Sequence, residues 1–461
     1  MAPAVTSTVK PDVSPEWHGE DVMIRDVLDA LTQIRDKFAR AEAGDDEHIH
    51  PRNCVMTLIG VAPSEAHEEL ARRTTLTIGT QHPAQAIVIR EEAPIRGRHL
   101  DAWITSEVRR SEVACAWQCE IITLHVHGRA AEHLAELVDP LLVSGVPTYL
   151  WWLGTPPFGK KELVDALRVC DGLVVDSARF EEPYNSFRRM AALLKVAHHR
   201  LGIADVQWAR LRPWRESIAQ FFTPVERRGF LNGISEIGVD YAGQGRGNRI
   251  AAALITGWIA AALGWKLKRA AAGTGGVVVA HYEAGNRFIE VDFRPVEKDH
   301  LASGEVSAVR IGGASQGTTF RLSVQHDPVR RPALSEPAYR SLHHAGGEDD
   351  AGMELAERRA EWHRDVLHEN LDSLHHTATG DPPGESRPKR PRVLTTERRR
   401  PDSTRVLLTM IEIGDGAPLR HVQQMEPEDE PALLLDLLST GTHDDVYNRS
   451  LAAASELVDK F

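Results

Sequence analysis

The chain is poor in features that mark several classes of protein. Its 461 residues include only four cysteines, and these have no regular spacing, which argues against a disulfide framework. Acidic residues outnumber basic ones, and the formal net charge is −12. Proteins that wrap nucleic acid normally carry a basic face. We therefore expect no disulfide scaffold and no nucleic-acid partner.

Long apolar runs are also absent. The best candidate, residues 250–265, is shorter than the roughly 18 apolar residues of a membrane-spanning helix and predicts a buried helix instead. Residues 1–19 lack the apolar centre and cleavage pattern of a signal peptide, and they predict a disordered lead. We expect a cytoplasmic protein that makes no membrane contact.

Known catalytic and cofactor motifs are scarce. We find no H-E-x-x-H zinc motif and no C-x-x-C pair. The glycines at 243, 245 and 247 begin like a dinucleotide-binding loop, but Asn248 stands where that fingerprint needs glycine or alanine. The loop also lacks the Gly-Lys-Ser/Thr of a P-loop, so it predicts a tight strand-to-helix turn. We expect no catalytic residue and no cofactor.

The cysteines and histidines are weak indicators of metal or redox chemistry. Cys115 and Cys119 share one face of a predicted strand with His125 and His127, so a zinc site is conceivable. Structural zinc ligands usually come from tight turns, however, and small buried thiols in a sheet are the favoured interpretation. We predict no metal. Spacing leaves redox control open for all four cysteines: Cys54, Cys115, Cys119 and Cys170.

The first half of the chain predicts an α/β domain. An amphipathic helical pattern begins near residue 20, and apolar, β-rich runs then alternate with helical patterns. The runs lie at residues 53–63, 86–92, 119–128, 146–152 and 171–180. Such alternation is typical of a parallel sheet with helices on both faces. We predict a Rossmann-like N-terminal domain over residues 20–222.

The second half changes its pattern. A strand, a glycine-rich loop and a helix at 249–264 precede several short alternating runs joined by turns. These runs predict an antiparallel β-meander with the helix on one face, which is an α+β arrangement. Residues 329–402 are rich in Pro, Gly and charge and predict a partly flexible insert. The predicted C-terminal domain therefore comprises residues 223–328 and 403–461.

Two adjacent tryptophans end one of the predicted strands. Trp151 and Trp152 must point to opposite faces of the sheet, so both are buried only if helices cover both faces. The Pro156-Pro157 turn and Phe158 follow, at the carboxyl edge where parallel sheets bind ligands and partners. Burial of both indoles and exposure of one as a partner anchor remain equally open.

A second aromatic stretch, residues 205–222, interleaves tryptophan with arginine before a pair of phenylalanines. Pro213 in this stretch predicts the start of a helix. Arginine beside tryptophan indicates either cation–π packing within the fold or a surface that binds an acidic partner. The pattern is compatible with both.

These motifs, taken in order, resemble those of a known family. VPTYLWWLGTPPF, DGLVVDSARF, DVQWARLRPWRESIAQFF and GWIAAALGW are similar to segments of the OpcA family of glucose-6-phosphate dehydrogenase assembly proteins. The resemblance covers residues 20–326 and 403–461. It implies a non-catalytic protein that binds glucose-6-phosphate dehydrogenase and promotes its assembly or allosteric activation in the oxidative pentose phosphate pathway.

The resemblance does not identify the contact residues, so we choose them on physical grounds. Tryptophan, tyrosine and arginine dominate interface hot spots. The candidates are Tyr149, Trp151, Trp152, Phe158, Arg179, Trp208, Arg210, Trp214 and Arg215.

The alternative function is a sugar-phosphate or nucleotide-binding α/β enzyme that uses the crevice near Asp176. Ser177 and Arg179 would assist there, because the guanidinium group suits phosphate recognition. The simpler interpretation of these three residues is a capped turn.

Overall fold

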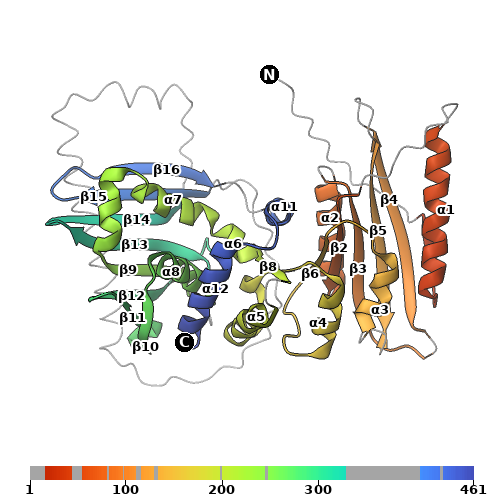
Figure 1. Cartoon of the computed structure of the whole chain (residues 1–461), viewed down its shortest axis with the longest axis horizontal. Helices are drawn as coiled ribbons and strands as arrows, with labels where there is room; N and C mark the ends of the chain where they lie inside the picture. The colour runs from red at the N-terminus through yellow and green to blue at the C-terminus, as the bar shows by residue number, and fades with distance from the viewer. Residues whose placement is uncertain are drawn as a thin grey trace, which may run out of the picture. The chain divides into compact units, whose positions relative to one another are not determined.

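Two eight-stranded sheets form the framework of the protein in the computed structural model (Figure 1). The structure describes residues 16–43, 54–79, 82–96, 98–110, 116–128, 133–197, 200–243, 248–328, 405–425 and 429–461. Four sequence predictions lie wholly or largely outside this part: the disordered lead, the insert at 329–402, Cys115 and the glycine loop at 244–247. Residues up to Asp327 and from Arg405 onward belong to one compact unit.

The first sheet is mostly parallel. Its strands, in spatial order, are β1 (Trp17–Gly19), β4 (Leu100–Arg110), β5 (Ala116–His127), β3 (Ala84–Glu92), β2 (Met56–Ala62), β6 (Thr148–Trp152), β7 (Gly172–Val175) and β8 (Gly202–Asp205). The six strands from β5 to β8 pair in parallel, whereas β4 and β1 add an antiparallel edge. Numbered along the chain, the six parallel strands have the order 3-2-1-4-5-6, which reverses between β2 and β6.

Helices bury both faces of this sheet, as the runs of apolar residues require. One face packs against α1 (Ile24–Ala43), α4 (Lys161–Ala166) and α5 (Pro183–Ala197). The other face packs against α2 (Glu65–Gly79), α6 (Val206–Arg210) and α11 (Glu430–Thr440). Trp151 is buried in the second of these clusters, and Trp152 packs half-buried against the first. The two indoles thus lie on opposite faces, as predicted.

The second sheet is mixed. Its order is β10 (Lys266–Ala272), β11 (Val278–Ala284), β12 (Arg287–Val296), β9 (Ile234–Ala242), β13 (Val306–Ser315), β14 (Thr318–Pro328), β15 (Arg405–Ile413) and β16 (Leu419–Met425). The four predicted runs form the hairpins β11–β12 and β13–β14. Strand β9 lies between the hairpins and pairs in parallel with β12, so a continuous meander is not confirmed. The fold is mixed α/β with two multi-stranded sheets.

The helices that pack on the second sheet come from distant parts of the chain. α8 (Ile250–Leu263) is apolar around nearly its whole surface and is buried from Ile250 to Gly257. α12 (Asp445–Val458) packs against α8 and also contacts α5. α7 (Arg212–Phe222) begins with Pro213 in its first turn, as predicted, and contacts β15. No helix in the described part of the chain is long and apolar enough to span a bilayer.

Candidate functional site

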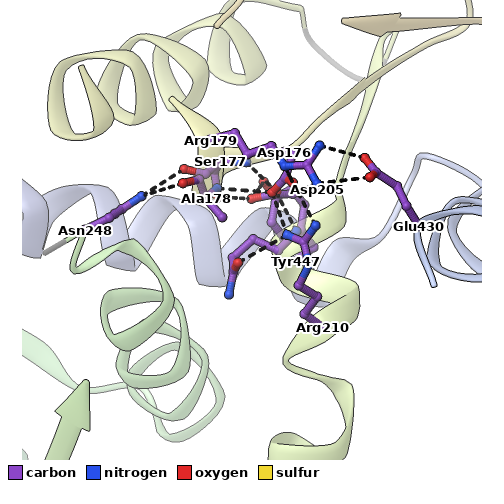
Figure 2. A network of polar contacts seen from close by, with 10 residues as sticks. Asp176, Ser177, Ala178, Arg179, Asp205, Arg210, Asn248, Glu430 and Tyr447 are labelled. Atoms are coloured by element: carbon purple, nitrogen blue, oxygen red, sulfur yellow. Dashed lines mark hydrogen bonds and ion pairs between the residues drawn. The ribbon is translucent and has the colours of Figure 1, made fainter. Parts of the chain in front are cut away.

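A network of polar side chains lies at the carboxyl ends of β7 and β8 (Figure 2). Asp205, the last residue of β8, is fully buried. Its carboxylate accepts hydrogen bonds from the Ser177 backbone N–H at 3.0 Å, from Ser177 Oγ at 2.6 Å and from Tyr447 Oη at 3.3 Å. Burial raises the pKa of Asp205 to about 6. Burial also raises the pKa of the Tyr447 hydroxyl well above its usual value.

A chain of ion pairs continues from this buried centre to the surface. Arg210 donates from Nη1 and Nη2 to the two oxygens of Asp176 at 2.7 and 2.8 Å. Arg179 lies 3.2 Å from the same carboxylate through Nε and forms two 3.0 Å hydrogen bonds with Glu430 of α11. Because bidentate pairs of this kind fix geometry as well as charge, the network holds α11 against the edge of the first sheet.

The loop before α8 joins the same network. Asn248 Nδ2 donates to the backbone carbonyls of Ser177 and Ala178 at 3.2 and 3.3 Å, and its Oδ1 accepts from Ile250 N at 2.9 Å. The residue that breaks the dinucleotide fingerprint therefore accepts from the first N–H of α8 and bonds to the turn after β7.

These contacts bear directly on the alternative catalytic crevice. Asp176 caps the short 3-10 turn Ser177–Arg179 through Ala178 N, as the capped-turn interpretation expects. Ser177 Oγ donates to the Asp205 carboxylate, and within the described residues it has no hydrogen bond to a histidine. Arg179 is engaged by Asp176 and Glu430. The three residues have structural roles here, and the charges of Asp176 and Arg179 are already paired.

The nine predicted contact residues divide by burial. Four of the aromatic residues are at most 4% exposed, so the expectation that they lie at the surface is wrong: Trp151, Phe158, Trp208 and Trp214. Tyr149, Trp152, Arg210 and Arg215 are half-buried, and Arg179 is exposed. The reason is that side chains of distant elements contribute to the cores around these rings: Leu434 of α11 belongs to the same cluster as Trp151, and the ring of Tyr447 of α12 packs on that of Trp208.

The Trp-Arg stretch forms cation–π packing within the fold. The Arg215 guanidinium carbon lies 3.5 Å from the centre of the Trp208 ring, and Nη2 donates to the Trp208 carbonyl at 3.3 Å. Trp208 Nε1 in turn donates to Asp444 at 3.0 Å. Burial lowers the pKa of Arg215 to about 10. Its Nε is buried without a hydrogen-bond partner among the residues described.

A groove of about 410 Å³ opens beside this stack. Trp208, Arg212 and Arg215 form one wall, and residues at the end of α11 and the start of α12 form the other. Arg212 pairs with Asp436 at 2.8 Å, whereas Glu216 is exposed. The groove is the concave surface on which two of the predicted contact residues meet.

Two motifs that the sequence analysis missed prove to be turns. Residues 313–317 read G-A-S-Q-G, but Ser315 ends β13 and Gln316 and Gly317, both with positive φ, turn the chain into β14. The nucleophile elbow needs a strand-to-helix turn, so this hairpin does not provide one.

Residues 154–160, G-T-P-P-F-G-K, match most of a phosphate-binding loop after β6. Pro156 and Pro157 lack N–H groups, and the N–H groups of Phe158 and Lys160 bond to the carbonyls of these two prolines. The loop therefore offers few donors to a phosphate.

The polar groups at the carboxyl ends of β3 and β5 are likewise engaged with each other. His125 Nε2 lies 3.0 Å from Glu68 in the first turn of α2, and Arg90 pairs with the same carboxylate at 3.1 Å. In dinucleotide-binding folds the pyrophosphate occupies this kind of helix N-terminus. Here Glu65 and Glu68 stand in that turn, and carboxylates disfavour a second anion there.

The described cysteines are structural. Cys54, Cys119 and Cys170 donate to backbone carbonyls of Met56, Thr75 and Ala166, respectively. Burial raises the pKa of Cys170 to about 12, which disfavours the reactive thiolate. Within the described residues no group of His, Cys, Asp and Glu is arranged to hold a metal ion.

Comparison with known families decides the relationship. A family model described as the glucose-6-phosphate dehydrogenase subunit N-terminal domain matches residues 76–192, and the model of the corresponding C-terminal domain matches residues 201–451. The chain belongs to the OpcA family. Both models carry the OpcA name, and the second alone matches more than half of the chain.

Curated relatives carry the same name. An OxPP cycle protein OpcA of Nostoc punctiforme is 28% identical over 238 residues, which is 52% of this chain and 48% of the relative. The Synechocystis OpcA is 33% identical over 147 residues, which is 32% of this chain and 30% of the relative. The chain spans about half the length of the Nostoc relative and less than half the length of the Synechocystis relative. A solved Clostridium difficile dehydrogenase aligns at 10% identity over 59% of this chain and 78% of its own, with a TM-score of 0.30.

Proposed function

We propose that this protein binds glucose-6-phosphate dehydrogenase and promotes its assembly or allosteric activation in the oxidative pentose phosphate pathway. The observation that carries the proposal is the match of the two family models, which together span residues 76–192 and 201–451. Both models are described as domains of a glucose-6-phosphate dehydrogenase subunit. We also propose that this protein is non-catalytic and cytoplasmic.

The polar groups of the first sheet support a binding role over a catalytic one. The order 3-2-1-4-5-6 supports a Rossmann-like class for its parallel strands, whose ligand crevice lies where the order reverses. The carboxylates and arginines at this carboxyl edge neutralise one another, as the Asp176–Arg210 and Glu68–Arg90 pairs illustrate. A site built to bind substrate would keep convergent polar groups available.

We propose the groove beside Trp208 and Arg215 as part of the contact surface, together with half-buried Trp152 and exposed Arg179. Arginine is enriched in interface hot spots, and Arg212 and Arg215 both line this groove. Exposed Glu216 lies at the same groove, so a charge change there alters the surface without disturbing the buried stack.

Activation requires a difference in affinity between two states of the enzyme. A partner that binds both states equally shifts neither, however tightly it binds. We expect this protein to bind the active or assembled state more tightly. If the enzyme's substrate favours the same state, the substrate should raise the affinity of the enzyme for this protein by the same factor by which this protein raises its affinity for the substrate.

The test is an activity assay of glucose-6-phosphate dehydrogenase from the same cell with and without the purified protein, combined with size-exclusion chromatography of the mixture. We expect a co-migrating complex and a raised rate or a lowered substrate requirement. Glu216→Arg should weaken the complex at least tenfold, whereas Glu226→Arg, an equal charge change at another exposed glutamate, should not. No complex and no change in rate would contradict the proposal.

A further inference from the structure

A second groove, of about 630 Å³, lies between the C-terminal end of α5, the start of β8 and the first turns of α12. We propose that it binds the phosphate monoester of a small polyol, such as a hexose phosphate. Its volume is within the roughly 300–1,000 Å³ of small-molecule sites. This proposal concerns a ligand of the chain itself and does not rest on the proposed partner.

The charge of this groove favours an anion. Lys195 and Arg449 line it, His443 stands at its rim, and Asp445 is the one carboxylate among its lining residues in the described chain. Lys195 and Arg449 are both exposed, and Arg449 Nε donates to the Asp445 backbone carbonyl at 3.2 Å. Neither Lys195 nor Arg449 pairs with a carboxylate within the described residues. By contrast, Arg179 and Arg210 at the carboxyl edge of the first sheet are paired with carboxylates.

A lysine and an arginine on facing elements suit a phosphate dianion. The guanidinium can offer two parallel N–H donors to two phosphate oxygens, and the ammonium adds a mobile point charge. Because Lys195 belongs to α5 and Arg449 to α12, the two cations approach the groove from different sides. The phosphate group is therefore expected to bind between the two helices.

The remaining lining residues favour a polyol over a nucleoside. Asn448 contributes an amide whose Oδ1 is buried and has no hydrogen-bond partner among the described residues. If the amide turned its oxygen toward the groove, a sugar hydroxyl bound there would supply the missing donor. Leu194 and Leu201 add apolar surface for the C–H face of a sugar ring. No Phe, Tyr or Trp side chain lines the described groove, and the imidazole of His443 is its one aromatic ring there, so it offers little stacking surface for a nucleobase.

The neighbouring groove provides an internal contrast. It shares His443 and Asp445 with this one, but its wall also carries Glu216, Asp436 and Asp444 against two arginines. An anion that approaches this face of the chain is therefore disfavoured at the first groove and favoured at the second.

The experiment is isothermal titration of the full chain, without any partner enzyme, with glucose 6-phosphate, glucose and inorganic phosphate. We expect glucose 6-phosphate to bind at least tenfold more tightly than either of the other two. The double variant Lys195→Ala/Arg449→Ala should weaken glucose 6-phosphate at least tenfold, since each hydrogen bond to a charged group is worth about one factor of ten. Asn448→Ala should reduce the preference for the sugar phosphate over inorganic phosphate.

The control is Lys161→Ala/Arg168→Ala, which removes the same two charges from exposed positions on and next to α4. It should bind glucose 6-phosphate like the wild type, and thermal melting should show both double variants folded. Equal affinity for glucose 6-phosphate and inorganic phosphate would overturn the polyol assignment. Absence of binding, or binding that the Lys195/Arg449 variant leaves unchanged, would overturn the site. A failed activity assay with the proposed partner enzyme leaves this titration unaffected, so the two proposals fail separately.

Discussion

At the scale of single residues, neighbours in the sequence have very different surroundings. Trp151 and Trp152 are adjacent on β6, yet Trp151 is 2% exposed within one core cluster and Trp152 is half-buried at the edge of another. Strand parity predicts that the two rings point apart. It cannot predict which ring is better covered, because the cluster that buries Trp151 includes Leu434, far along the chain.

Single substitutions at these tryptophans should therefore have unlike effects. Trp151→Ala leaves a large cavity and should lower the free energy of unfolding by about 3–5 kcal/mol. Trp152→Ala should cost clearly less stability, because its ring is already partly in water, and should weaken binding of the proposed partner by about 2 kcal/mol or more. Urea denaturation of both variants, with a pull-down by the partner, measures the two effects. Equal and severe destabilisation of the two variants would contradict the assignment of Trp152 to the contact surface.

The candidate site shows the same limit of sequence reasoning. Asp176, Ser177 and Arg179 follow a predicted strand, and their capped turn could be anticipated from the sequence. Their partners Asn248 and Glu430 lie 71 and 251 residues away, and no local pattern indicates them. The charges that looked available for phosphate are consequently neutralised by residues that only the fold brings near.

At the scale of elements, periodicity predicts long regular segments well and edge strands poorly. The helices at α1, α2, α5 and α8 and the strands β2, β3 and β5 appear where the patterns indicate them. No strand is predicted from the sequence at β4, in which the charged Asp101 follows Leu100 at the start. In the structure Asp101 is buried and accepts from Arg98 Nε and His127, so the charge is compensated within the sheet. Strands β1, β8, β10 and β16 carry too few apolar residues to be recognised alone.

The turn between α11 and α12 packs closely against glycines of the first sheet. A Cβ added at Gly202, at the start of β8, would lie 2.6 Å from the Thr442 carbonyl oxygen. A Cβ at Gly60 on β2 would meet nothing closer than 3.5 Å, which is ordinary contact. Close packing thus requires a glycine at position 202 but not at position 60, although both residues stand in parallel strands of one sheet.

We predict that Gly202→Ala destabilises the protein by about 1–3 kcal/mol, because the α11–α12 turn must move away from β8. Gly60→Ala is the matched control and should change stability by less than about 1 kcal/mol, since the new methyl group fits and the unfolded chain loses entropy. Chemical denaturation gives both values. Limited proteolysis should also cut the Gly202→Ala variant faster near Thr442, and a Gly202→Ala protein as stable as the Gly60→Ala protein would contradict the packing argument.

At the scale of the whole molecule, the two C-terminal helices connect the cores of both sheets. The α11 residues Leu434, Leu437 and Leu438 belong to the cluster that contains Trp151, on one face of the first sheet. The α12 residues Leu451 and Leu457 belong to the larger cluster, which contains Leu173 of β7 in the first sheet and Val239 of β9 in the second. A domain boundary near residue 222, predicted from the change in pattern, stays a prediction, because pattern reports local structure and not whether two sheets share a core.

A shared core has a measurable consequence, which is that damage to one sheet lowers the stability of the other. Leu58→Ala in β2 removes a side chain that is 2% exposed and should cost about 2–5 kcal/mol. If the described unit unfolds cooperatively, native-state hydrogen exchange of β9 and β13 should lose the same free energy of protection as that of β2 and β6. Val164→Ala, at a position 52% exposed, controls for the substitution itself and should leave every strand unchanged. Loss of protection confined to the first sheet would show instead that residues 20–222 unfold as an independent domain. The C-terminal helices would then form an interface between two domains and would not belong to one common core.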